Sequence, residues 1–120
     1  MQAVIGRPAA ARPILLQSHA LSPYPASVAW AGRCAVLLAD LDAARADLAL
    51  FDETGSHGPA FDAGRASIAA GILALEGRTA DALAAYRDVR RRWRQLGLPW
   101  DDALTALEIC LLYTSPSPRD

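Results

Sequence analysis

The stretch Gly77–Gly97 constrains the fold most strongly, because its apolar side chains recur at a helical period. Six of them fall at i, i+3, i+4, i+7, i+11 and i+14: Ala82, Ala85, Tyr86, Val89, Trp93 and Leu96. This spacing places them on one side of a helix with 3.6 residues per turn. Thr79 can cap the first turn, where Asp81 interacts favourably with the helix dipole. Gly97 supplies a left-handed exit, and Pro99 prevents continuation of the helix.

The preceding segment, Phe61–Glu76, has the pattern of a second helix that packs on the first. Its apolar face consists of Ile68, Ala69, Ile72, Leu73 and Leu75. Small residues at 69–71 would let the following helix approach closely, and Glu76-Gly77-Arg78 forms a tight turn between the two. The sequence therefore predicts an antiparallel helical hairpin with Tyr86 and Trp93 buried inside it.

Helical patterns continue toward the N-terminus, so the expected fold class is all-α. A proline in mid-helix costs about 3 kcal/mol. We therefore expect only a short helix from Pro13 to about Leu21, with Ser22-Pro23-Tyr24-Pro25 as a loop. A better helix follows over Ala26–Ala39, and Ser27 is available as its cap.

Two more helices flank the hairpin. Asp42 is expected to cap the first, in which Ala44, Leu48 and Phe51 share a face. Residues 54–59 then form a loop rich in glycine and small polar residues. After the hairpin another helix begins on the same pattern, with Trp100, Ala103, Leu104 and Leu107 on its apolar face.

Three turn-and-start segments recur along the chain at intervals of 33 and 38 residues. They are Gly6-Arg7-Pro8…Ala11, Ala39-Asp40-Leu41…Ala44 and Gly77-Arg78-Thr79…Ala82. A period in the thirties with two helices per unit is typical of an α-solenoid. The second helix of the unit resembles that of the tetratricopeptide (TPR) repeat, with Ala82, Tyr86 and Val89 in the motif positions and Ala44, Leu48 and Phe51 filling them more loosely. The Trp-Leu-Gly pattern of the family's first helix is reduced to Ala66, Ala69 and Ala70.

A narrower resemblance covers Leu73–Ile109. This run is similar to the TPR-like C-terminal regions of bacterial LuxR-type regulators with an AAA/STAND ATPase module, and of class III adenylate/guanylate cyclases. The string Trp93-Arg94-Gln95-Leu96-Gly97 carries the likeness. In such proteins the repeats are implied to sense or dock partners, while catalysis and DNA binding lie elsewhere. The resemblance thus implies a protein-interaction or sensory scaffold, with signal transduction and transcriptional regulation as its setting.

Net charge and hydropathy narrow the classes of partner. The 120 residues carry a formal net charge of −1, which offers no field to attract nucleic acid or an anionic membrane. Met1–Ala11 lacks the basic start and apolar core of a signal peptide, and no apolar run approaches the ~18 residues of a membrane span. A cytoplasmic protein is the expectation.

Residues that could carry chemistry are few. Cys34 lies alone on an apolar face and is expected to be a small buried hydrophobe. His19 and His57 have no carboxylate or cysteine at a recognisable spacing, and no nucleophile motif occurs. We expect no enzyme activity, no catalytic or cofactor-binding residue, no cofactor and no metal in these residues.

The basic run Arg90–Arg94 is the one alternative binding feature. It could hold phosphates while Trp93 stacks on a base. Against this, Trp93 lies on the apolar stripe, and Asp88 is placed to pair with Arg91 and Arg92 at i+3 and i+4. We therefore expect a solvated face, with nucleic-acid binding, or a role as the accessory region of a nucleotide cyclase, as alternatives to protein interaction.

The C-terminal residues 110–120, CLLYTSPSPRD, do not continue the helical pattern before them. Their back-translation matches the transposase adapter of tagmentation sequencing libraries, so we interpret them as a non-native tail. The expected domain is then 1–109, a TPR-like fragment truncated at both ends. Solenoid units bury their apolar faces against neighbours. Both uncapped ends should therefore expose apolar surface and favour self-association or contact with other domains of the parent chain.

Overall fold

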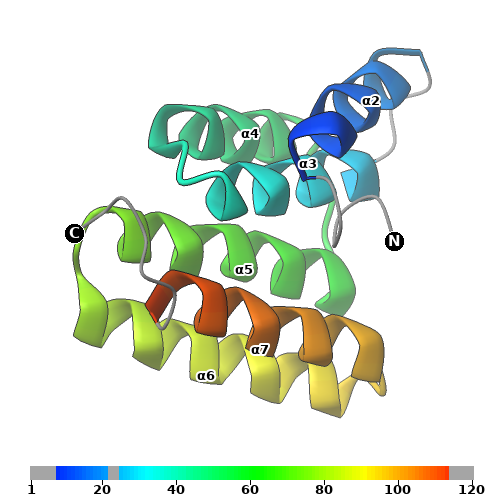
Figure 1. Cartoon of the computed structure of the whole chain (residues 1–120). Coiled ribbons are helices and arrows are strands. Elements are labelled where there is room, and N and C mark those ends of the chain that lie inside the picture. Colours follow the sequence, from blue (N-terminus) through cyan, green and yellow to red (C-terminus); the bar gives the residue numbers. More distant parts are fainter. Residues whose placement is uncertain (1–7, 22–24, 114–120) are drawn as a thin grey trace.

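A computed structural model describes residues 8–21 and 25–113, which form six helices and no strand (Figure 1). The helices are α2 (Pro8–Leu21), α3 (Pro25–Leu37), α4 (Leu41–Glu53), α5 (Pro59–Leu75), α6 (Thr79–Gln95) and α7 (Pro99–Tyr113). The all-α prediction is confirmed, as is the pairing of the segments around Gly77 into the hairpin α5–α6.

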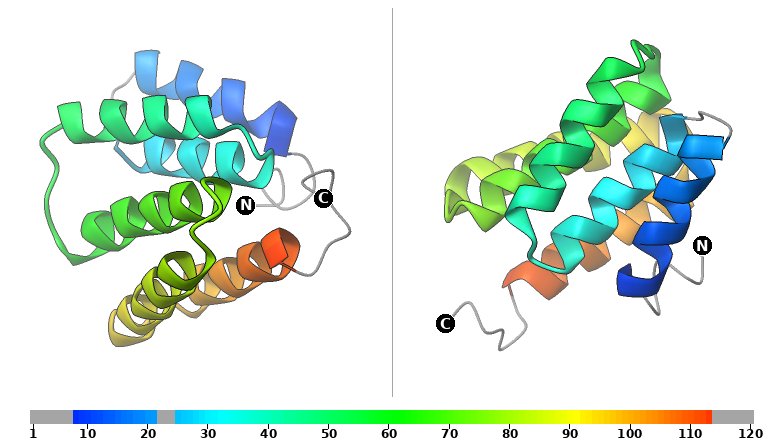
Figure 2. Two further views of the ribbon diagram at one scale, coloured as in Figure 1. Left: turned by 90° about the vertical axis from the view of Figure 1, so that its left-hand side faces the viewer. Right: turned by 90° about the horizontal axis from the view of Figure 1, so that it is seen from above.

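Each helix packs on the next one in the chain, so the molecule is a row of helical hairpins (Figure 2). Helix α3 lies at the centre of the row, because it contacts α2, α4, α5 and α7. Helix α7 therefore closes back onto the first half of the molecule as well as packing on α6. This return of α7 brings together side chains from both halves.

Three helices end in the same way, which accounts for the tight turns between them. Ala39, Gly77 and Gly97 each adopt a positive φ of 56°, 82° and 69°. At each turn this residue donates its N–H to the carbonyl three residues back, and the next residue donates to the carbonyl five residues back. Such paired bonds close a Schellman-type helix end. The predicted left-handed exit at Gly97 is confirmed, and two of the turns repeat the geometry at the predicted 38-residue interval.

The predicted helix caps were wrong at two positions. The carboxylate that caps α4 belongs to Asp40, which accepts a 3.0 Å hydrogen bond from the Ala43 N–H, and Asp42 lies inside the first turn. Thr79 is the first residue of α6, and Arg78 occupies the cap position without a side-chain bond. In both cases the helix begins one or two residues before the predicted start. The Schellman-type bonds of the preceding turn fix this position.

The N-terminal helix is longer than predicted. Helix α2 runs unbroken from Pro8 to Leu21 with Pro13 in its interior, so the expected start at Pro13 is wrong. Pro13 is exposed, which leaves its ring on the solvent side of the helix. Helix α3 begins at Pro25, where proline suits the first helical position. The predicted turn at Gly6-Arg7, the loop residues 22–24 and the side chain of Ser27 lie outside the described residues.

The core forms around the residues expected to fill it. Tyr86 is fully buried and Trp93 is 4% exposed, as predicted. The close approach made possible by the small residues of α5, however, is toward α3 rather than α6. A Cβ at Gly71 would lie 2.5 Å from a methyl of Val36, and one at Gly32 would lie 2.6 Å from the end of Ile68. The face that α5 buries is therefore the small-residue face, and Ile72, Leu73 and Leu75 are only half buried.

Helix α7 continues to Tyr113, so the expectation that helical structure stops at Ile109 was wrong. Leu112 is buried in the same cluster as Tyr86, and Tyr113 packs against that cluster. The buried face of the helix is mixed, because it consists of Leu104, Thr105, Glu108 and Leu112. Trp100 and Leu107, which lie on the predicted apolar face, are exposed. The buried charges of the site below explain this orientation.

Candidate binding cleft between the hairpins

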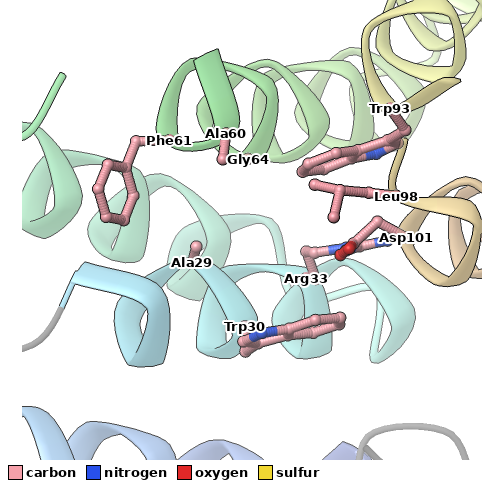
Figure 3. Close-up of a pocket in the computed structure, with 9 residues that line it drawn as sticks. All are labelled: Ala29, Trp30, Arg33, Ala60, Phe61, Gly64, Trp93, Leu98 and Asp101. Atoms are coloured by element: carbon pink, nitrogen blue, oxygen red, sulfur yellow. The ribbon is translucent and has the colours of Figure 1, made fainter. Parts of the chain in front are cut away.

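A cleft of about 240 Å³ opens where α3, α5 and the α6–α7 connection meet (Figure 3). Its lining residues are Ala29, Trp30, Arg33, Ala60, Phe61, Gly64, Trp93, Leu98 and Asp101. Small residues from α3 and α5 form one end together with Phe61, and the tryptophans, Arg33 and Asp101 form the other end (Figure 3). The cleft is thus mainly apolar, with its charges gathered at one end.

Arg33 is buried to 3% exposure, and all three guanidinium nitrogens have partners on α7. Its Nε donates to Glu108 Oε1 at 2.7 Å, and Nη2 donates to Thr105 Oγ1 at 3.3 Å. Its Nη1 makes a longer contact of 3.4 Å with Asp101 Oδ1. A buried guanidinium needs such compensation, since removing a charge from water is costly. Arg33 therefore ties the centre of the molecule to its last helix.

Two indole rings flank the guanidinium. The Cζ atom of Arg33 lies 4.6 Å from the centre of the Trp30 ring and 5.9 Å from that of Trp93. Both distances are within the range of cation–π attraction. Trp93 is fixed in turn, because its Nε1 donates to Thr105 Oγ1 at 3.0 Å and the Thr105 hydroxyl donates to the Asp101 carbonyl. The Trp93 wall of the cleft is therefore held in place by hydrogen bonds.

Burial controls the protonation of the groups behind this wall. Removal from water raises the pKa of Glu108 above its ordinary value, and the Arg33 guanidinium offsets part of that effect. Burial also raises the pKa of Tyr86, with a further contribution from the nearby Glu108 carboxylate. Glu108 is 4% exposed, whereas the side chain of Asp101 is 20% exposed and lines the cleft.

The charge of the predicted basic run is partly balanced, because two carboxylates pair with its four arginines. Asp88 accepts from both Arg91 and Arg92, and Asp102 accepts from Arg90 at 2.8 Å and from Arg94 at 3.2 Å. These hydrogen bonds hold the pKa of Asp88 and of Asp102 below the ordinary value. The pairing of Asp88 with two arginines and the burial of Trp93 are as predicted, so the indole is not exposed beside the arginines. A separate hollow of about 360 Å³ is lined by Pro59, Asp62, Arg91, Arg92, Gln95 and Leu96.

The remaining candidates of the sequence have simple environments. Cys34 is fully buried, as predicted, and burial raises the pKa of its thiol to about 11. His57 is exposed, and the side chain of His19 lies outside the described residues. Among the described residues no group of three or more His, Cys, Asp or Glu side chains could hold a metal ion.

Sequence reasoning missed the cleft and most of its polar residues. Arg33, Thr105 and Glu108 are buried, although none of them belongs to an apolar face that periodicity predicts. A signal was present, because Arg33 is the one charged residue in a long apolar run and Glu108 is the one charged residue in another. Two isolated, opposite charges on apolar helices are candidates for a buried ion pair.

Comparison with protein-family models, with curated proteins and with solved structures finds no significant match to the chain. In the part of the chain that the structure describes, no helix is both long and apolar enough to cross a membrane.

Proposed function

We propose that the chain is a protein-interaction or sensory scaffold, a TPR-like segment of a larger cytoplasmic bacterial regulatory protein, and that the cleft holds a segment of a partner protein. The observation that carries this proposal is the cleft itself. It is open, mainly apolar and walled by two tryptophans and a phenylalanine. Aromatic residues in a concave site are typical of binding surfaces. The 38-residue interval between two identical turns supports the repeat architecture.

The polar groups of the cleft support binding more than chemistry. Arg33 directs its donors at Glu108, Thr105 and Asp101, and the indole of Trp93 directs its donor at Thr105. These groups hold one another in fixed positions. A rigid wall of this kind lowers the entropic cost of binding a partner.

Selection of short displayed peptides against the full chain tests the proposal. Ala60 is exposed and lines the cleft, so Ala60→Leu should fill part of it. Ala84 is exposed on α6 and does not line the cleft, which makes Ala84→Leu the matched control. We expect selected peptides to lose affinity for the first variant only. Peptides that bind both variants equally would place the interaction elsewhere and contradict the proposal.

Nucleic-acid binding through Arg90–Arg94 remains the alternative, and an oligonucleotide titration at low salt tests it. Phosphate contacts make affinity fall steeply with salt. The ion pairs to Asp88 and Asp102 reduce the charge that this face offers. We therefore expect no salt-dependent binding of a single-stranded oligonucleotide.

A further inference from the structure

We propose that the cleft recognises a basic side chain, lysine or arginine, carried by the partner segment, with Asp101 as its counter-charge and the aromatic walls as its contact surface. This inference rests on the proposed scaffold function and names the chemistry of the partner. Three features of the cleft support it: incompletely balanced charge, aromatic faces and an apolar, small-residue end.

The charge of Asp101 is only partly balanced. Arg33 makes its short contact, 2.7 Å, with Glu108, and its contact with Asp101 is 3.4 Å long. Two carboxylates thus share one guanidinium, and Asp101, which has the longer contact, lines the cleft and is 20% exposed (Figure 3). Arg33 lines the same cleft, but together Arg33, Asp101 and Glu108 carry a net charge of −1, which favours a cation over an anion beside Asp101.

The aromatic walls favour the same charge. Ring faces are electronegative and attract ammonium and guanidinium groups. The Cζ atom of Arg33 lies 4.6 Å from the centre of the Trp30 ring, so an aromatic ring of this cleft already interacts with one guanidinium. Trp93 lies at the same end of the cleft as this stack, and Phe61 lines the opposite end (Figure 3).

The small-residue end of the cleft suits the methylene stem of a long basic side chain. Small apolar surfaces lie there beside Phe61, contributed by Ala29, Ala60 and Gly64. Lysine and arginine bury their methylene stems along such surfaces while the charged head reaches a polar group. An arginine or lysine with apolar neighbours therefore matches the cleft better than an acidic or purely apolar segment.

The test uses the full chain and three capped peptides, acetyl-Ala-Leu-X-Leu-Ala-amide, in which X is arginine, glutamine or glutamate. Binding is followed by the NMR shifts of the Trp30 and Trp93 indole N–H groups. We expect the arginine peptide to bind about 5-fold more tightly than the glutamine peptide, from one exposed ion pair and one cation–π contact. The glutamate peptide should bind most weakly, and added salt should reduce the differences.

Asp101→Asn should bring the arginine and glutamine peptides to equal affinity, and Asp101→Glu should restore the preference. The matched control is Asp102→Asn, which removes the neighbouring carboxylate that pairs with Arg90 and Arg94 outside the cleft. Helicity and melting temperature confirm that each variant is folded.

Equal affinity of the three peptides for the unaltered chain overturns the inference, as does a preference for glutamate or a failure of all three to bind. So does a preference for arginine that survives Asp101→Asn. None of these results bears on whether displayed peptides bind the cleft, so the scaffold proposal stands or falls separately.

Discussion

At the scale of the residue, the protein depends on a few polar contacts in an otherwise alanine-rich interior. Alanine contributes little apolar area, so the large side chains that remain carry much of the stabilisation. Tyr86, Trp93 and Phe51 are buried, and Trp93 is also held by its hydrogen bond to Thr105. Loss of such a residue should therefore be costly.

Trp93→Ala should reduce the free energy of unfolding by about 3–5 kcal/mol, because it removes a buried ring and leaves a cavity. Trp100→Ala is the matched control, since that tryptophan is 48% exposed, and it should change stability by less than about 0.5 kcal/mol. Urea unfolding measures both. Similar losses for the two variants would show that the indole of Trp93 contributes no more than an exposed one.

Glu108 should make stability depend on pH. Burial raises its folded-state pKa above the unfolded value of 4.5, so the folded protein binds the proton more tightly than the unfolded chain. The free energy of unfolding should then fall as pH rises from 4.5 through the folded pKa. Asp47, whose pKa burial also raises, acts in the same direction. Glu108→Gln should therefore flatten the profile without abolishing its slope, and an unchanged slope would contradict this.

At the scale of the element, the three Schellman-type turns are equivalent in hydrogen bonding but not in residue. Ala39 adopts the left-handed conformation that Gly77 and Gly97 adopt in the other two. That conformation strains a residue with a Cβ. The turn at Ala39 is therefore the most strained of the three.

Ala39→Gly should raise the free energy of unfolding by about 0.5–1 kcal/mol, the strain relieved less the entropy added to the unfolded chain. Gly77→Ala should lower it by a similar amount, and for the same reason. A Cβ at Gly77 would meet nothing within 4 Å, so strain alone decides the result. Thermal unfolding of the two variants measures the pair, and shifts of the same sign would refute the argument.

The end of α7 should contribute to stability. Deleting 110–120 removes Leu112 from the core cluster, which should cost about 2 kcal/mol or more. Deleting 114–120 removes none of the described contacts and serves as the control. This reverses the expectation from sequence that the whole tail has no structural role. If the chain that lacks 110–120 melts at the same temperature as the full chain, the tail has no structural role and this prediction is wrong.

Periodicity predicted the helices and the burial of Tyr86 and Trp93, because both can be read from the spacing of apolar residues along one helix. It could not predict the inner face of α7. That face is set by Arg33, which is separated from Glu108 by 75 residues. Because the buried guanidinium requires polar partners, α7 buries Thr105 and Glu108 beside Leu104 and Leu112, and Trp100, Leu107 and Leu111 become exposed. The cleft was missed for the same reason, since its walls come from helices distant in sequence.

At the scale of the whole molecule, the orientation of α7 leaves an apolar surface at the end of the row. Trp100, Leu107 and Leu111 are 48%, 40% and 47% exposed on this helix, and Ile14 is 63% exposed on α2. Exposed apolar surface at the ends was predicted, with Trp100, Ala103, Leu104 and Leu107 on the apolar face of the last helix, and of these Leu104 is buried instead. Adjacent exposed hydrophobic residues favour association.

The purified chain should therefore self-associate in a concentration-dependent manner, measured by sedimentation velocity. Replacing Leu107 with Glu and Leu111 with Lys should shift it toward the monomer. The control places the same charges at Ala80 and Ala84, which are exposed on α6. A chain that sediments as a monomer at all concentrations would contradict this prediction.

The ion pair between Arg33 and Glu108 also bears on how the molecule unfolds. In an array where each unit touches only its neighbours, terminal units can fray one at a time. Here the departure of α7 would break the contacts of Arg33 with Glu108, Thr105 and Asp101 and the bond of Trp93 to Thr105 together. Separate unfolding of α7 is therefore unfavourable, and α7 and α3 should unfold in a single cooperative step.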